Sequence, residues 1–245
     1  MKADPAVQRR LLDLAGVDAE LARVQHQRRT MPELAEVADG EKAAQAKRDA
    51  QVAVQMQLDD LDREVARQEK EIDAVRARED RDRKLLAGGT VGAKQLTDLE
   101  HELATLERRQ AILEDDLLEL MERREAVEMD GKHASVELAK AEDALAEANR
   151  RRDENLADLD TNESRRDAER AKILPDIPAD LLALYERKRK QKGIGAALLR
   201  ARRCGACRIE LDRREISRIK DTAGDEVLEC EECGAILIRT PESGL

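Results

Sequence analysis

Four cysteines near the C-terminal end of the chain form two Cys-x-x-Cys pairs, Cys204 with Cys207 and Cys230 with Cys233. Two thiolates held in one tight turn can bind the same metal ion, and two such turns supply the four sulfur ligands of a closed tetrahedral site. Such a site is typical of structural zinc and leaves no coordination position for a catalytic water. The sequence therefore predicts one structural Zn²⁺ ion bound by these four cysteines.

Three other roles for the cysteines remain open from the sequence alone: a redox dithiol, a rubredoxin-like iron site, or free thiols. Paired Cys-x-x-Cys motifs in a reducing compartment favour metal over disulfides. The chain starts with Met1 and a polar segment without a signal-peptide apolar region, and no apolar run approaches membrane-spanning length. We therefore expect a cytoplasmic protein that does not contact the membrane, and we favour zinc.

The residues around the cysteines predict a small β module. Residues 194–199 read as a strand that leads into the first pair, and residues 236–238 as a strand that closes the module after the second pair. The pairs are 22 residues apart, and we expect segment 211–220 to loop out between them. Because this module lacks an aromatic core, the ion should supply much of its stability. Residues 193–245 are thus predicted to form a Cys₄ zinc ribbon.

A heptad repeat dominates the rest of the chain. From Leu96 to Ile173, apolar residues recur at alternating steps of three and four on one grid, and a similar stripe runs upstream. This period is typical of a coiled coil. A glycine-containing turn at 88–92 separates two arms of nearly equal length, so residues 1–174 should fold back as an antiparallel hairpin. Pro32 should break or kink the first arm.

The equal arms also predict which residues lie opposite each other. We expect Val54 to face Val127 and Gln68 to lie close to Gln110, where a buried polar pair would fix the alignment. The predicted fold class is therefore mainly α, a long, kinked antiparallel coiled-coil hairpin with a small C-terminal β zinc ribbon. Residues 175–192 should form a linker helix with a basic end, with Tyr185, the only aromatic residue, on its apolar side.

A basic run adjoins the cysteines. Residues 187–220 carry thirteen Lys or Arg and three acidic residues, although the net charge of the chain is −10. One hypothesis is a surface that binds phosphates or an acidic partner. The other is a solubilising face that offsets the acidic arms and the negative zinc–thiolate group. The candidate residues are Arg187, Lys188, Arg189, Lys190, Lys192, Arg200, Arg202 and Arg203.

The C-terminal sequence resembles a known family. The segments 181–187 and 193–196, followed by the two cysteine pairs, are similar to the bacterial C4-type zinc ribbon family with an N-terminal coiled-coil hairpin. The match covers roughly the last 70 residues by motif and the remainder by architecture. It implies a hook-shaped antiparallel coiled coil capped by a zinc ribbon, without enzymatic activity. Some members are adaptors that bind a transcription sigma factor or flagellar export components, and RNA binding has been attributed to the group.

We therefore favour a non-enzymatic scaffold or adaptor that binds protein partners through the coiled coil and the zinc ribbon, with a link to transcription. The alternative is a regulator that binds RNA or DNA with the basic run. The sequence contains no arguable Ser/His/Asp constellation, and residues 88–94 depart from a phosphate-binding loop. We expect no small-molecule substrate. A monomer is favoured, and exchange of arms between two chains would give a dimer.

Overall fold

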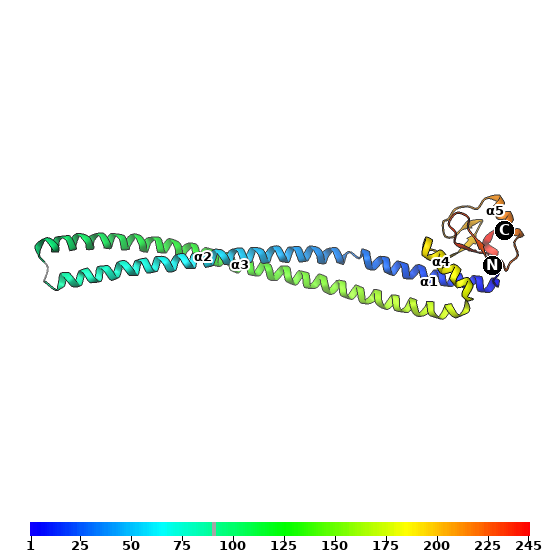
Figure 1. The fold of residues 1–245 in the computed structure, drawn as a ribbon, viewed down its shortest axis with the longest axis horizontal. Helices are drawn as coiled ribbons and strands as arrows, with labels where there is room; N and C mark the ends of the chain where they lie inside the picture. Colours follow the sequence, from blue (N-terminus) through cyan, green and yellow to red (C-terminus); the bar gives the residue numbers. More distant parts are fainter. Residues whose placement is uncertain (90–91) are drawn as a thin grey trace. The chain divides into compact units, whose positions relative to one another are not determined.

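The computed structural model describes residues 1–89 and 92–245, and it consists of long helices and a small sheet (Figure 1). This confirms the predicted fold class. None of the described helices has the length and apolarity that a membrane span requires. The helices are α1 (Pro5–Thr30), α2 (Glu33–Ala87), α3 (Ala93–Ile173), α4 (Ala179–Lys192) and α5 (Arg213–Asp221), with short 3₁₀ turns η1 (Leu174–Asp176) and η2 (Pro241–Ser243).

The chain divides into two compact units, residues 35–150 and residues 1–34 with 151–245. In the first unit, α2 and α3 run side by side in opposite directions (Figure 1). Ion pairs join them, for example Arg76 with Glu114 at 2.6 Å. The sequence predicted a turn at 88–92, of which residues 90 and 91 lie outside the described residues.

The seam between α2 and α3 is narrow, and two contacts report its register. Gln68 donates a side-chain amide hydrogen to the backbone oxygen of Leu113 at 3.1 Å, and Gln110 donates to Glu114 of its own helix at 2.7 Å, so each amide of the predicted polar pair has another hydrogen-bond partner. A Cβ atom at Gly131 would lie 3.6 Å from a side-chain carbon of Val54, so Val54 packs against the turn of α3 that follows Val127. Heptad spacing fixes the buried face of each helix, but a shift by one turn keeps the same faces in contact.

The second unit contains α1, the end of α3, α4 and the zinc ribbon. Asp4 caps α1 by accepting a hydrogen bond from the backbone N–H of Ala6 at 2.7 Å. The break predicted at Pro32 is confirmed: α1 ends at Thr30, Met31 is extended, and α2 begins at Glu33. Proline lacks the backbone N–H that a continuous helix would require there.

The ribbon contains four strands, β1 (Ala196–Arg200), β2 (Arg203–Cys204), β3 (Leu228–Glu229) and β4 (Ile236–Ile238). They form one sheet in the order β2-β1-β4-β3. Strand β1 pairs in parallel with β4 and antiparallel with β2, and β3 pairs antiparallel with β4. The predicted first strand and closing strand are therefore both present.

Tyr185 lies at the centre of the core that joins α1 and α4 to this sheet. Its side chain is fully buried in a cluster with Leu11, Leu14 and Ile236. A Cβ atom at Gly195 would come within 2.5 Å of the Tyr185 ring. Only glycine therefore lets the chain pass the ring on its way into β1.

Candidate metal centre and basic surface

The two cysteine pairs occupy turns of the same form. In the first turn the N–H of Arg208 donates to the backbone oxygen of Cys204, and in the second the N–H of Gly234 donates to that of Cys230, both at 2.8 Å. Arg208 and Gly234 both have left-handed backbones, with φ of 64° and 71°. Each turn follows a short strand, so the sheet holds the first cysteine of each pair in place.

Gly205 has a separate role in the first turn. A Cβ atom at this position would lie 2.7 Å from the backbone oxygen of Leu198 in β1. The N–H of Gly205 donates to that same oxygen at 2.9 Å. The turn therefore approaches the neighbouring strand more closely than any other residue type would allow.

The four sulfur atoms form one compact group. All lie within 4.8 Å of one another. The Sγ atoms of Cys204 and Cys233 are 3.8 Å apart, and those of Cys207 and Cys230 are 4.0 Å apart. Tetrahedral zinc with Zn–S bonds of about 2.3 Å requires sulfurs about 3.8 Å apart. The geometry therefore fits one structural zinc ion, as the sequence predicted.

Burial and hydrogen bonding shift the pKa values of three of these thiols. Burial raises the pKa of Cys204 to about 12, and it also raises the pKa of Cys230. Burial acts in the same direction on Cys207, but hydrogen bonds from the backbone N–H of Ile209 and the neighbouring thiols outweigh it and lower that pKa. Since zinc binds thiolates, metal binding must displace protons here, which couples zinc affinity to pH.

Two of the predicted basic residues serve the interior of the unit. The side chain of Lys188 is 16% exposed and pairs with Glu229 in β3. Its ammonium nitrogen lies 3.8 Å from where a Cβ atom of Gly234 would stand, so it places a positive charge beside the second cysteine turn. Arg189 pairs with Asp18 at 3.4 Å. Neither cation is freely available to a partner.

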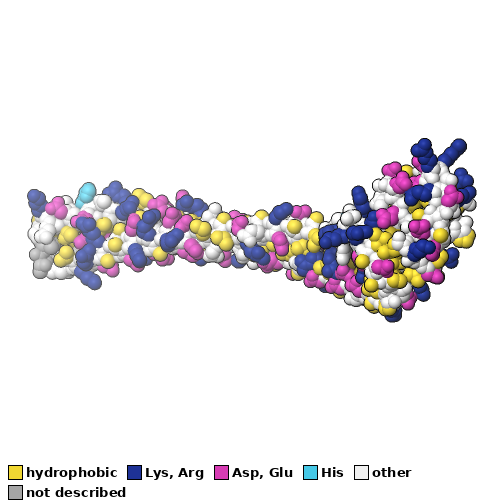
Figure 2. Space-filling model, turned by 45° about the vertical axis from the view of Figure 1, so that its right-hand side comes forward, with side chains coloured by type: hydrophobic (Ala, Val, Ile, Leu, Met, Phe, Trp, Pro, Cys, Tyr) yellow, Lys and Arg dark blue, Asp and Glu magenta, His cyan; other side chains and the backbone are white. Residues whose placement is uncertain are grey.

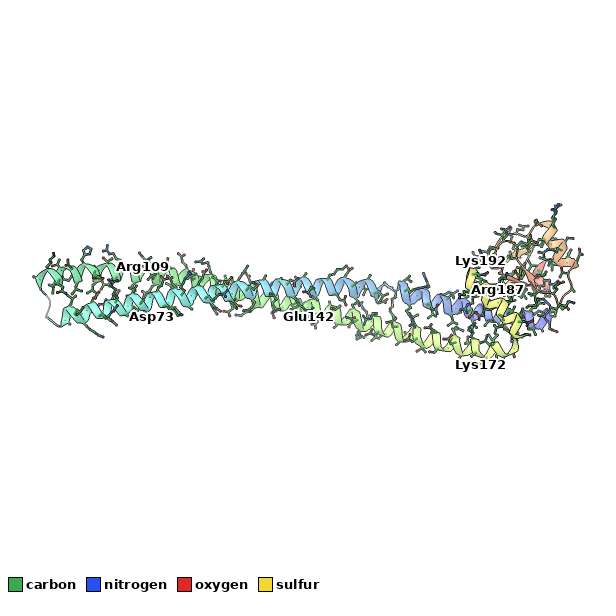
Figure 3. The ribbon with its side chains drawn as sticks, in the orientation of Figure 1. Asp73, Arg109, Glu142, Lys172, Arg187 and Lys192 are labelled. Atoms are coloured by element: carbon green, nitrogen blue, oxygen red, sulfur yellow. The ribbon has the colours of Figure 1, made fainter. Side chains whose placement is uncertain are left out.

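The remaining six predicted basic residues differ in whether they form ion pairs or hydrogen bonds within the chain. Arg200 pairs with Glu242, Arg203 pairs with Glu210, and Arg202 donates to the backbone oxygen of Gly244. The other three are exposed and make no ion pair or hydrogen bond within the described residues. These three are Arg187, Lys190 and Lys192, and Figure 3 labels the first and last of them on α4.

Sequence reasoning missed α5, which forms where we expected a loop. The Asp212 side chain accepts a hydrogen bond from the N–H of Glu215 at 2.7 Å. An Asp followed three residues later by Glu is a capping-box pattern, and Ile216 and Ile219 supply a buried face, so the signal was present. Exposed basic residues lie on the other side of this helix. Figure 2 shows Lys and Arg side chains projecting from the part of the molecule that holds the ribbon.

A buried polar cluster around Asp18 was also missed. Asp18 is 5% exposed and occupies a position on the apolar stripe of α1. It accepts hydrogen bonds from the Tyr185 hydroxyl at 2.7 Å and from Arg170 Nε at 2.8 Å. Burial raises the pKa of Tyr185 above its ordinary value, and the interaction with the Asp18 carboxylate raises it further. The cluster therefore joins α1 to α3 and α4. The sequence feature that could have revealed it is Asp18 itself, a polar residue among the apolar positions of α1.

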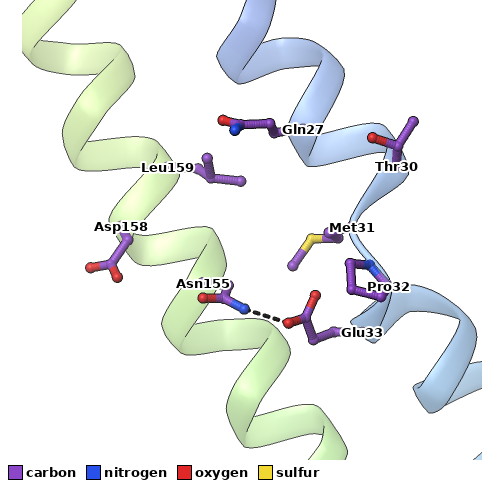
Figure 4. A pocket seen from close by; sticks show the side chains of 8 residues that line it. All are labelled: Gln27, Thr30, Met31, Pro32, Glu33, Asn155, Asp158 and Leu159. Atoms are coloured by element: carbon purple, nitrogen blue, oxygen red, sulfur yellow. Dashed lines mark hydrogen bonds between the residues drawn. The ribbon is translucent and has the colours of Figure 1, made fainter.

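The break between α1 and α2 opens a pocket of about 330 Å³ (Figure 4). Its apolar lining includes Met31 and Leu159, and Asn155 donates to Glu33 across it at 2.6 Å. The lining contains no His or Cys, and the Thr30 hydroxyl is already engaged with the backbone oxygen of His26. The pocket therefore lacks an activated nucleophile.

Comparison with known proteins identifies the family. Residues 14–193 match the family described as the CT398-like coiled coil hairpin domain, and residues 203–237 match the C4-type zinc ribbon domain. The chain belongs to the CT398-like coiled-coil hairpin family. Neither family description names an enzyme. An uncharacterized protein of Mycobacterium tuberculosis strain H37Rv is 46% identical over 98% of both chains, and one of Mycobacterium leprae is 35% identical over 91% of this chain and 96% of its own.

Two solved structures share the fold of this hairpin family. A structure from Mycobacterium smegmatis has 44% sequence identity and a TM-score of 0.89, covering 98% of this chain and 100% of its own. CT398 from Chlamydia trachomatis has a TM-score of 0.70 over 95% of this chain and 97% of its own, and its 17% identity shows the fold alone. The relatives are bacterial, as the sequence resemblance implied.

Proposed function

We propose that this chain is a non-enzymatic adaptor that binds protein partners through its coiled coil and its zinc ribbon. The observation that carries the proposal is the small share of the long helices that is buried. In residues 35–150, α2 and α3 bury one narrow seam, which includes Val37, Ile72 and Leu113, and the other faces are exposed. A structure that leaves so much helical surface in solvent is suited to recognition by other helices.

The proposed functional parts follow the predicted boundaries. Residues 1–174 form the hairpin, 175–192 the linker helix and 193–245 the ribbon. In this proposal the zinc ion has no reaction to perform, because four cysteines complete its shell. It holds the ribbon surface in shape for a partner. Four reduced cysteines support a cytoplasmic location, and the family resemblance extends the proposal to a partner in the transcription apparatus.

A second candidate function is binding of RNA or DNA. It is favoured by the three exposed basic residues of α4 that lack an internal carboxylate: Arg187, Lys190 and Lys192. Exposed Arg213 and Arg214 of α5 add to the positive charge of the same unit. Nucleic-acid binding through such residues releases counterions, so its affinity falls steeply with salt.

Binding at two salt concentrations separates the candidates. The test compares the intact protein with a variant in which Arg187, Lys190 and Lys192 are all changed to Gln. A matched control changes Arg67, Lys70 and Lys84 to Gln, three exposed cations of α2. The adaptor predicts a protein partner, identified by co-purification and then bound as a purified protein at physiological salt. The alternative predicts binding of labelled RNA or DNA that weakens at least about tenfold in the α4 variant but not in the control.

A further inference from the structure

The segment between the two cysteine pairs contains a buried acid, Glu215 of α5. Its side chain is only 7% exposed, and it lies next to buried Ile216 in the helix that Asp212 caps. Ile216 belongs to one apolar cluster with Cys204 and Cys230, so the buried face of α5 packs beside the metal centre. Because a buried carboxylate is costly unless it is hydrogen-bonded, the partners of Glu215 indicate its role.

One oxygen of Glu215 accepts a hydrogen bond from the second cysteine turn. The backbone N–H of Glu231, the residue that follows Cys230, donates to Glu215 Oε1 at 3.4 Å. Arg218 lies near both carboxylates, with its Nη2 2.9 Å from Glu231 Oε1 and 4.0 Å from Glu215 Oε1. The helix α5 is therefore connected to this turn through the backbone and through an ion pair.

The first cysteine turn has an equivalent contact that the backbone supplies. Gly205 follows the first cysteine of its pair, as Glu231 does in the second pair. The N–H of Gly205 donates to the Leu198 oxygen of β1 at 2.9 Å. In both turns the N–H after the first cysteine is thus held by an acceptor outside the turn. A strand provides that acceptor for the first turn, and the Glu215 side chain provides it for the second.

Holding this N–H fixes the direction of the rest of the turn. Hydrogen bonds from the next two backbone N–H groups, those of Glu232 and Cys233, act to lower the pKa of Cys230 against the larger effect of burial. They therefore favour the thiolate that zinc binds. A turn that is free to rotate about Cys230 would lose the aim of these two groups.

We propose that Glu215 is a positioning residue of the zinc centre, which holds the second cysteine turn through the N–H of Glu231. It does not belong to the group of four sulfur ligands and acts on them through the backbone. The role requires a hydrogen-bond acceptor and not a negative charge. Glutamine, which keeps a side-chain oxygen, should therefore replace Glu215, and alanine should not.

The zinc affinity of the full chain, measured by competition with a chromogenic chelator, tests the proposal. Glu215→Ala should weaken zinc binding about 10–100-fold, as is typical when a residue that orients metal ligands is removed. Glu215→Gln should bind zinc as the wild type does. Glu210→Ala is the matched control, because Glu210 is an exposed acid that follows the first cysteine turn and pairs with Arg203 at 2.9 Å. It should leave the affinity unchanged.

Hydrogen exchange of single amides in the zinc-loaded protein separates positioning from a general loss of structure. The Glu231 amide should be protected in the wild type and in Glu215→Gln, and it should exchange faster in Glu215→Ala. The amides of Gly205 and of α5 should stay protected in all three proteins, because the first turn has its own acceptor and Asp212 still caps the helix.

Four results would overturn the proposal. The first is equal zinc affinity in Glu215→Ala and the wild type, and the second is a Glu215→Gln variant that binds zinc as weakly as Glu215→Ala. The third is weaker zinc binding that accompanies unfolding of α5. The fourth needs no variant: a Glu231 amide that exchanges in the wild type as fast as in an unfolded peptide.

Discussion

Tyr185 donates its hydroxyl hydrogen to Asp18 Oδ2 at 2.7 Å, which joins α4 to a residue 167 positions earlier in the chain. Both side chains are almost completely inaccessible to solvent. Arg170 holds the other carboxylate oxygen at 2.8 Å, so Asp18 is a buried charge with partners on both sides. The only aromatic residue of the protein thus fixes how α1, α3 and α4 meet beneath the ribbon.

Replacing Tyr185 by Phe should lower the free energy of unfolding by about 1–3 kcal/mol, because a buried carboxylate oxygen of Asp18 loses a hydrogen-bond donor. Urea unfolding followed by circular dichroism measures the change. Thr161→Val, which removes an exposed hydroxyl bonded only to its own helix, is the control and should change stability by less than about 0.5 kcal/mol. Equal effects of the two substitutions would show that the Asp18 contact is not stabilising.

The same hydroxyl predicts a dependence on pH. Burial raises the pKa of Tyr185 in the folded protein above its unfolded value of about 10. The stabilisation is therefore fully present below about pH 10 and is lost as pH rises further. The difference in stability between wild type and Tyr185→Phe should be constant from pH 7 to 9 and shrink above pH 10. A difference that grows with pH would contradict this assignment.

Gly195→Ala should destabilise the packing of the ribbon on α4. The added methyl group would come within 2.5 Å of the Tyr185 ring and 2.8 Å of the Tyr185 backbone oxygen. Overpacking of this kind typically costs about 1–3 kcal/mol. Gly16→Ala in α1 meets nothing within 4 Å, and it should instead stabilise by about 0.5–1 kcal/mol. Thermal unfolding of both variants compares them, and similar melting temperatures would be evidence against the close contact.

The sequence predicted those features that depend on local spacing. The cysteine pairs, the strands beside them and the break at Pro32 each follow from a few adjacent residues. The exact register of the hairpin could not be fixed from the sequence, because moving Val54 by one turn leaves its apolar neighbours equivalent. Asp18 was missed because a polar residue on an apolar stripe reads as an interruption until its partners, distant in sequence, are known. The capping pattern at Asp212 was local, and sequence reasoning overlooked it.

The central claim is that four cysteines hold one zinc ion on which the ribbon depends. The most direct test is the metal content of the protein purified without added zinc, combined with limited proteolysis. Wild type should contain about one zinc per chain, and Cys204→Ser should lose it and expose residues 193–245 to cleavage. The α2–α3 seam should stay intact, because it makes no use of the metal. Substantially less than one zinc per chain in the wild type, or an equally resistant ribbon in Cys204→Ser, would contradict the account.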